Sequence, residues 1–397
     1  MKKIFFLIIV ALQIISCTHQ SNSKLNDYSE LVEIKIDAKN GLIYPLDSLF
    51  TGEVHFVKLE TNDENLIGEV SNLFFDDSLI FIVDKYNTMS IFIFDINGNY
   101  ITKISNFGNG PGEYSMIYNC FILKKEKKIV VVDTPQQKNI YYSYSGDYIS
   151  EEKNPFPIIN CEYLESGYKV FYNSHFKQSD NHVLIITDKD NNIIYSACDE
   201  FKSDKFVLNE PFEFWKYGDE LFFHPNFSDT LFVITDTGAL AKYYINVVHD
   251  KMPQPSEIDN VTTDSFLENY LNKYPHFSGS FVELDNLTYL EISRLGFKII
   301  YSHNTNNTYL FSDGNNALYH FFNTPISSYG KDKIVVPTWP TKIVSSRKFL
   351  YEDVRKVNER FQLNTIEVDK VFLDSLYHNL NEEDNPVLFF YELNTRL

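Results

Sequence analysis

Short apolar segments, each followed by a polar turn, recur along the chain from about residue 53 onward. Four of them follow one another at 70–75, 79–84, 89–95 and 100–104. Polar residues separate these segments at 76–78, 85–88 and 97–99, and the last of these turns contains Asn97-Gly98, a pair that favours tight hairpins. Apolar runs bounded by such turns predict short antiparallel β-strands.

This rhythm repeats along most of the chain. Further units span 118–150, 158 to about 198, and 212–248, while a fifth starts near 289 and a sixth at 326. Units of about 40 residues with four strands each are typical of β-propellers. We therefore predict an all-β fold, a six-bladed β-propeller over residues 31–397. Because a circular array has to be closed, we expect the C-terminal strand at 385–391 to complete the sixth blade by pairing near 54–59 or 31–36.

Two segments break the strand pattern and predict short helical insertions in the late blades. The first is 256–274, where Phe266, Leu267, Tyr270 and Leu271 are at helical spacing. The second lies within 345–380, and its apolar residues fall on one predicted helical face. These residues are Val368, Val371, Phe372, Leu376 and Leu380.

A glycine-rich stretch at 106–114 ends the first unit and opens the second. Three glycines tolerate positive φ, and Pro111 fixes its own φ, so the stretch predicts a tight loop between two blades. Glu113 is its one charged residue. We weigh two roles for it, either a carboxylate that accepts backbone N–H bonds within the turn or a ligand-binding carboxylate at the mouth of the channel.

The N-terminus has the pattern of an export signal. Lys2 and Lys3 precede an apolar run over 4–15 that only Gln13 interrupts, which is too short to span a bilayer of about 30 Å. The run ends at Ser16-Cys17, which resembles the cleavage site of a bacterial lipoprotein. We expect a signal peptide at 1–16, lipidation of Cys17, and a tether at 17–30, although an ordinary secretory signal is the alternative.

The net charge of −19 becomes −21 after removal of residues 1–16, because two lysines are lost and no acidic residue. Such a field repels phosphate backbones, so we expect no nucleic-acid partner. Cys120 and Cys161 are 41 residues apart and each follows an asparagine, which predicts equivalent buried positions in neighbouring blades. With Cys198 the number of internal cysteines is three, and their disulfide state stays open.

Candidate binding residues are few. Besides Glu113 and its neighbour Tyr114, we select His224 at the end of a strand and Arg294, which we place on an inner strand where it could clamp a carboxylate. A structural role is the alternative for each. Trp215 and Trp339 could stack on a sugar ring, although their aromatic and proline neighbours favour core positions.

Several motifs resemble the six-bladed β-propeller lipoproteins of Bacteroidota, a family with largely unassigned function that is distantly similar to NHL-repeat propellers. The resemblance covers nearly all of residues 30–395. It rests on residues 56–61 with Leu66-Ile67-Gly68, on 94–98 ahead of the glycine-rich loop at 108–114, on 227–231, and on 384–388. It implies the propeller fold and an exported, lipid-anchored state, and it implies no chemistry.

We therefore expect a non-enzymatic binding or scaffolding module without a cofactor, a monomer that recognises a glycan, a peptide or an envelope protein. It would contact the membrane only through its lipid, at the outer membrane and facing the periplasm, with the cell surface as the alternative. The rival hypothesis is a metal-assisted hydrolase or lyase that uses His224, Glu113 and Arg294. No Cys-x-x-Cys or His-x-x-His spacing marks a metal site.

Overall fold

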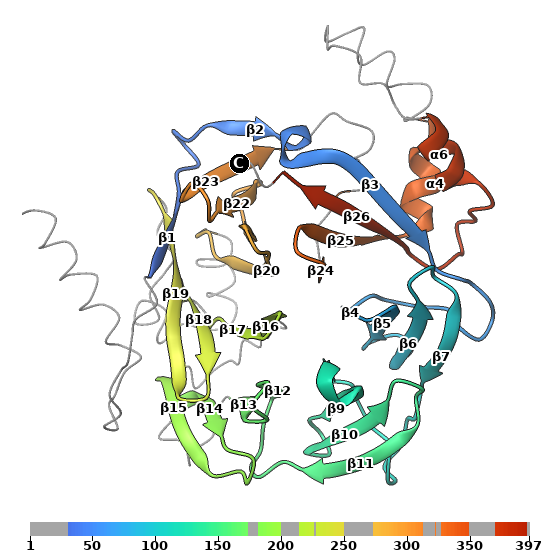
Figure 1. Ribbon diagram of the computed structural model, residues 1–397, viewed down its shortest axis with the longest axis vertical. Coiled ribbons are helices and arrows are strands. Elements are labelled where there is room, and N and C mark those ends of the chain that lie inside the picture. The colour runs from blue at the N-terminus through green and yellow to red at the C-terminus, as the bar shows by residue number, and fades with distance from the viewer. Residues whose placement is uncertain are drawn as a thin grey trace, which may run out of the picture. The chain divides into compact units, whose positions relative to one another are not determined.

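The computed structural model describes residues 31–173, 182–199, 214–225, 228–249, 273–312, 322, 327–348 and 370–394. Its strands form six sheets of four or five strands, which confirms the predicted six-bladed β-propeller (Figure 1). The contacts divide the chain into two compact units. The first comprises residues up to 38, 132–139 and 152–279, and the second comprises 39–131, 140–151 and the residues from 280 onward.

In the first unit lie blades 3 and 4. Blade 3 has the strand order β12 (Asn160–Tyr163), β13 (Lys169–Tyr172), β14 (His182–Thr187) and β15 (Ile193–Asp199). Blade 4 has the order β16 (Phe214–Tyr217), β17 (Glu220–Phe223), β18 (Thr230–Thr235), β19 (Gly238–Val247) and β1 (Val32–Ile36).

In the second unit lie blades 1 and 6 and most of blade 5. Blade 1 contains β4 (Asn72–Asp76), β5 (Leu79–Asp84), β6 (Ser90–Asp95) and β7 (Tyr100–Ile104). Blade 5 contains β20 (Phe277–Glu283), β21 (Leu287–Ile292), β22 (Lys298–Ser302), β23 (Asn307–Ser312) and β2 (Ile43–Pro45). Blade 6 contains β24 (Ser327–Tyr329), β25 (Lys333–Thr338), β26 (Val387–Leu393) and β3 (Phe50–Lys58).

Blade 2 has residues in both units. Its strands are β8 (Asn119–Leu123), β9 (Lys128–Asp133), β10 (Lys138–Ser143) and β11 (Tyr148–Lys153). The short helices of the described residues are two 3-10 turns, η2 (Leu46–Leu49) and η3 (Lys124–Glu126), and two α-helices, α4 (Pro340–Lys348) and α6 (Lys370–Tyr377). None of the helices in these ranges is long and apolar enough to cross a membrane.

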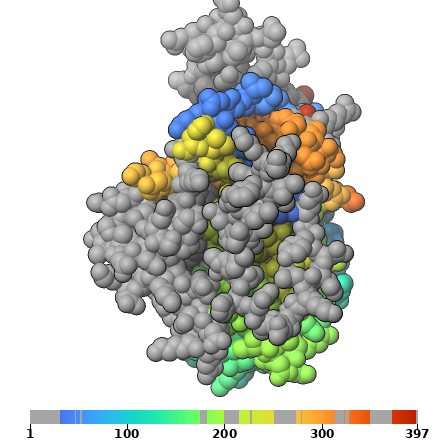
Figure 2. Space-filling model, turned by 90° about the vertical axis from the view of Figure 1, so that its left-hand side faces the viewer, coloured from blue at the N-terminus to red at the C-terminus, as the bar shows by residue number. Residues whose placement is uncertain are grey.

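Strands from the N-terminal segment add to three different sheets. β1 pairs parallel with β19, β2 pairs parallel with β23, and β3 pairs antiparallel with β26. Of the two partners considered for the C-terminal strand, β3 is the one it contacts, with Val54 opposite Tyr391. The residues of this segment, blue in Figure 2, lie at the molecular surface in that view.

Alternation along the strands divides the side chains of blade 1 between two hydrophobic cores. On β5, Phe81 and Val83 join the core shared with blade 2, while Ile80 and Ile82 join the core shared with blade 6. All four are fully buried. Because successive side chains of a strand point to opposite faces, one strand packs against both neighbouring sheets. Blades 3 and 4 share a similar core that contains Val170 and Leu221.

Cys120 and Cys161 are the second residues of β8 and β12, and both are buried free thiols, as is Cys198. The predicted equivalence of the first two positions is therefore confirmed. Desolvation raises the pKa of the Cys161 thiol well above its ordinary value, so this thiol stays protonated.

Three expectations need correction or fall outside the described residues. β20 was missed, because the fifth unit was expected to begin near residue 289. Of the predicted helical face, Leu376 is buried as expected, whereas Val371 is 79% exposed, and α6 also buries Leu373 and Tyr377. Val368 and residues 256–272 of the other predicted helix lie outside the described residues.

Because β1 pairs with β19 in blade 4, substitutions at two neighbouring positions of β1 should differ in their effect on stability. Ile34 is fully buried, so Ile34→Ala should lower the free energy of unfolding by about 2–4 kcal/mol. Lys35 is exposed on the same strand, and Lys35→Ala should change it by less than about 0.5 kcal/mol. Equilibrium unfolding in denaturant measures both. Equal midpoints for the two variants would show that β1 contributes nothing to the stability of the blade.

Candidate functional site

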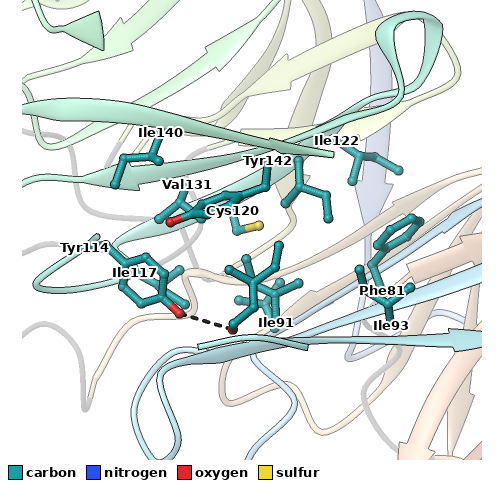
Figure 3. Packing of buried hydrophobic residues seen from close by; sticks show 13 residues of the cluster. Phe81, Ile91, Ile93, Tyr114, Ile117, Cys120, Ile122, Val131, Ile140 and Tyr142 are labelled. Carbon is teal, nitrogen blue, oxygen red and sulfur yellow. Dashed lines mark hydrogen bonds between the residues drawn. The ribbon is translucent and has the colours of Figure 1, made fainter. Parts of the chain in front are cut away.

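The loop between β7 and β8 is fixed to blade 1 through Tyr114. The ring is fully buried in the core drawn in Figure 3, and its hydroxyl lies 2.7 Å from the carbonyl oxygen of Met89 and 3.2 Å from that of Ile104. Burial raises the pKa of Tyr114, so the phenol remains a neutral donor. A buried ring with an engaged hydroxyl offers no surface to a ligand, and Tyr114 has a structural position.

The same loop is bound from blade 2 through Gly112. The Tyr142 hydroxyl donates to the Gly112 carbonyl at 2.7 Å, and the Gly112 N–H donates to Oε2 of Glu151 at 3.0 Å. Gly112 has φ +72, and a Cβ there would lie 2.7 Å from the ring of Tyr148. Left-handed backbone and close approach both require glycine at this position. The loop therefore connects two neighbouring blades.

Glu113 lies at the exposed side of this loop. Its Oε2 accepts the N–H of Gly110 at 2.8 Å, and its own N–H donates to the Gly110 carbonyl at 3.1 Å. This is the geometry of the structural role weighed from the sequence. A ligand contact by Glu113 stays a prediction.

His224 follows β17 and is buried. Its Nε2 lies 2.8 Å from the Ser228 carbonyl, to which it donates, and its ring centroid is 4.7 Å from that of Phe277. Desolvation lowers the pKa of His224 to about 4, so the imidazole is neutral at neutral pH. The side chain therefore connects the end of β17 to Ser228, which precedes β18.

The position of His224 recurs in other blades, a pattern that was not detected in the sequence because the residue type changes. A buried polar residue stands at or just after the end of the second strand of each of five blades. These residues are Asp84, Asp133, Asn173, His224 and Thr338. Asp84 shows the role: its carboxylate accepts the N–H groups of Gly68, Glu69 and Asn87. Asp133 likewise accepts the N–H of Gln136, whereas His224 donates to the Ser228 carbonyl, so these three side chains satisfy backbone groups of the adjoining loops.

Arg294 does not lie on an inner strand. It is exposed in the turn between β21 and β22 and has φ +67. Because β20 precedes these strands, the turn joins the second and third strands of blade 5. The expected position on an inner strand is therefore wrong, and binding of a carboxylate by Arg294 stays a prediction.

Two of the three residues named for a metal-assisted reaction are engaged by backbone groups. Glu113 accepts a loop amide and His224 donates to a carbonyl, whereas Arg294 is exposed in a turn. Within the described ranges, no group of three or more His, Cys, Asp or Glu side chains is placed to hold a metal ion.

The two tryptophans differ in their surroundings. Trp215 on β16 is partly buried, donates from Nε1 to the Gly279 carbonyl at 3.2 Å and packs edge-on against Phe277. Trp339 is 38% exposed between β25 and α4, so the expected core position is wrong for this residue. A half-exposed indole is a stacking surface for a ring or a cation.

Several large apolar side chains are exposed on loops in the described part of the second unit, Leu42 and Met116 among them. Four more are Trp339, Leu66, which is 48% exposed, Tyr86, which is 70% exposed, and Phe107, which is 62% exposed. Tyr86 joins the second and third strands of blade 1, while Leu66 and Phe107 lie in connections between blades. We name these four residues the aromatic loop surface.

Hydrogen bonds connect the loops that carry the aromatic loop surface. Thr338, next to Trp339, pairs with Val387, two residues after Asn385. Oδ1 of Asn385 accepts the N–H of Ile67 at 2.9 Å, which places Leu66 beside the start of β26. The following Gly68 lies against the Tyr86 loop, where a Cβ would be 2.5 Å from that of Asn87.

Phe107 is connected to the same loops through Tyr114, with which it forms an isolated β-bridge. The Tyr114 hydroxyl donates in turn to the carbonyl of Met89, three residues after Tyr86. The loops of blades 6 and 1 and the loop that opens blade 2 are therefore joined by direct contacts within one unit.

A buried acid lies apart from these loops. Glu162 on β12 is 5% exposed, and its Oε1 has no hydrogen-bond partner in the described part of the chain. Desolvation raises the pKa of Glu162 to about 7, although the nearby Lys216 ammonium lowers it. Lys216 itself donates to the Tyr163 carbonyl at 3.1 Å and lies 3.5 Å from Glu165. Sequence reasoning missed this residue, because nothing near it marks the acid as buried.

The comparisons with known proteins address the family. A model for a domain of unknown function, DUF4934, matches residues 45–392. The chain belongs to the DUF4934 family. A search of curated proteins gave no match.

Solved structures show the fold shared by this DUF4934 chain. One is a protein of Bacteroides fragilis NCTC 9343 that is named as an exported protein. It aligns with a TM-score of 0.70 and 20% identity, and the alignment covers 92% of this chain and 99% of the other. Another is a DUF4221 member from Bacteroides vulgatus ATCC 8482, with a TM-score of 0.51, 12% identity, and coverage of 86% of this chain and 98% of the other. The predicted resemblance to Bacteroides propellers of unknown function is confirmed, and the lipoprotein state stays a prediction.

The loop geometry predicts a graded loss of stability. Glu113→Ala removes one acceptor from an exposed turn and should lower the free energy of unfolding by about 1 kcal/mol. Gly112→Ala should cost about 2 kcal/mol or more, because it adds backbone strain to the contact with Tyr148. Thermal melting of both variants, with Glu113→Gln as the conservative control, measures the order. A melting temperature of Gly112→Ala equal to that of the parent chain would contradict it.

Glu162 predicts a pH dependence of stability. The folded-state pKa of about 7 exceeds the ordinary value of 4.5, so its stabilising contribution is complete below pH 4.5 and is lost as pH rises through 7. The loss is at most about 3 kcal/mol. Denaturant unfolding at pH 5 and pH 8 should show that Glu162→Gln gains stability relative to the parent at pH 8. The exposed Glu126→Gln is the control, and identical pH profiles for all three chains would refute the assignment.

Proposed function

We propose that this DUF4934 protein is a non-enzymatic binding or scaffolding propeller of the cell envelope. It acts as a monomer that is carried by a lipid on Cys17, at the outer membrane and facing the periplasm, and it recognises a glycan, a peptide or an envelope protein. The name of the Bacteroides fragilis relative, which proposes export, supports the location.

The single observation that carries this proposal is the aromatic loop surface. Large apolar side chains are costly to leave in water, and an exposed group of them marks interaction sites. Here Tyr86 and Phe107 are more exposed than buried, although the loops that present them are held by hydrogen bonds. Rigid loops that present aromatic rings bind with little loss of conformational entropy.

The engagement of His224 and Glu113 by backbone groups supports binding over catalysis. A general base has to reach a substrate proton, whereas the Nε2 of His224 is spent on the Ser228 carbonyl inside blade 4.

The test uses the mature chain with Cys17→Ser on glycan and peptide arrays. Trp339→Ala and Tyr86→Ala should each weaken binding of the ligand identified on the arrays by about tenfold or more, as expected of aromatic anchors. Ile193→Ala, which removes an exposed side chain from β15, should leave binding unchanged. Equal binding by all three variants would refute the surface. Membrane fractionation of native and Cys17→Ser chains tests the anchor, and recovery of both from the membrane would contradict lipidation.

A further inference from the structure

The loops beside Trp339 and Leu66 are strongly acidic. Residues 60–69 contain Glu60, Asp63, Glu64 and Glu69, and residues 382–384 are all acidic, whereas neither segment contains a lysine or arginine. This inference rests on the proposed function, because the acidic segments adjoin the aromatic loop surface and not another site.

Asn385 holds the two acidic segments together. Its Nδ2 donates to the carbonyl oxygens of Glu60 at 2.8 Å and Asn65 at 3.0 Å, and its N–H donates to the Thr61 hydroxyl at 2.8 Å. The acidic residues immediately before Asn385 are therefore fixed beside the 60–65 loop. Like charges are brought together by neutral amide bonds, at an electrostatic cost that an opposite charge from outside would remove.

Four of these carboxylates are exposed and have no hydrogen bond or ion pair within the described part of the chain. They are Asp63, Glu64, Glu382 and Glu383. The nearby lysines are used differently: Lys103 donates to the Glu64 carbonyl at 2.5 Å, and Lys58 donates to the carbonyls of Ser375 and His378. The cations of this region therefore bind backbone oxygens and leave these four carboxylates to solvent.

We propose that the partner of the aromatic loop surface is a cationic peptide segment, whose lysine or arginine side chains pair with these four carboxylates and stack on Trp339 and Tyr86. Exposed aromatic faces and unpaired carboxylates are the two groups that bind ammonium and guanidinium ions in water. Neither feature alone selects a partner: rings also bind sugars, and carboxylates alone bind any cation weakly. Their placement on loops joined through Asn385 selects a chain that carries both charge and apolar stems.

The charge of the whole protein acts in the same direction. A net charge of −19 attracts cationic segments at long range, and salt screens this attraction over about 10 Å at 0.1 M. Binding should therefore weaken steeply with ionic strength, whereas binding of a neutral glycan to the same rings should not.

The experiment measures fluorescence anisotropy of a labelled peptide of alternating lysine and leucine on the Cys17→Ser chain at low and at physiological salt. A charge-reversed glutamate–leucine peptide and a neutral oligosaccharide serve as competing probes. The double variant Glu382→Lys with Glu383→Lys should weaken binding of the cationic peptide by about tenfold at low salt, mainly by slowing association. Trp339→Ala should weaken binding of this peptide by a similar factor at both salt concentrations.

The matched control is Asp190→Lys with Asp219→Lys, which makes the same change in net charge on exposed turns of the first unit. Equal weakening by the two double variants would mean that only the net charge matters, and it would overturn the proposal. Binding of the neutral oligosaccharide alone, lost in Trp339→Ala, would overturn the cationic partner and retain the proposed function. Binding of no probe by a chain with the parent melting temperature would also overturn it.

Discussion

The need to bury both faces of every sheet is the constraint on which this fold depends. In blade 1 the alternation of β5 places Phe81 in one core and Ile82 in another, so neither face can be exposed without loss of a hydrophobic layer. A sheet with two apolar faces is stable only between neighbours, which is why the blades cannot fold as independent domains. Buried polar groups at the strand ends, such as Asp84 and His224, then serve the loops that connect these layers.

Much of the architecture was predictable because it depends on local patterns. Strands such as β5 and β7 follow from apolar runs bounded by Asp, Asn and Gly turns, and the number of blades follows from their period. β20 was missed because Ser278-Gly279-Ser280 interrupts its apolar pattern. Val371 was assigned to the buried side of its helix, whereas packing of α6 turns Leu373 inward, and this orientation depends on the neighbouring sheet.

The candidate site was less predictable, because exposure is a property of the folded chain. Trp339 has neighbours that are typical of a core, and only the geometry where β25 meets α4 leaves its indole half-exposed. Arg294 was placed on a strand because the missing β20 shifted the fifth blade by one element. Asn385 lies in the 384–388 motif that carries part of the family resemblance, but nothing in that motif indicates that its side chain connects segments more than 300 residues apart in sequence. Long-range amide contacts of this kind leave no periodic signal.

Pairing of β3 with β26 has a consequence for the time course of folding. β3 lies near the start of the described chain, and its partner begins at Val387, so the sixth blade has no complete sheet until almost the whole polypeptide is present. Contacts between such distant segments are slow to form. Until β26 pairs with it, β3 has an open edge with unpaired backbone groups, and a strand of another chain can pair with that edge. The closing strand thus sets both the slowest step of assembly and the interval during which aggregation competes with it.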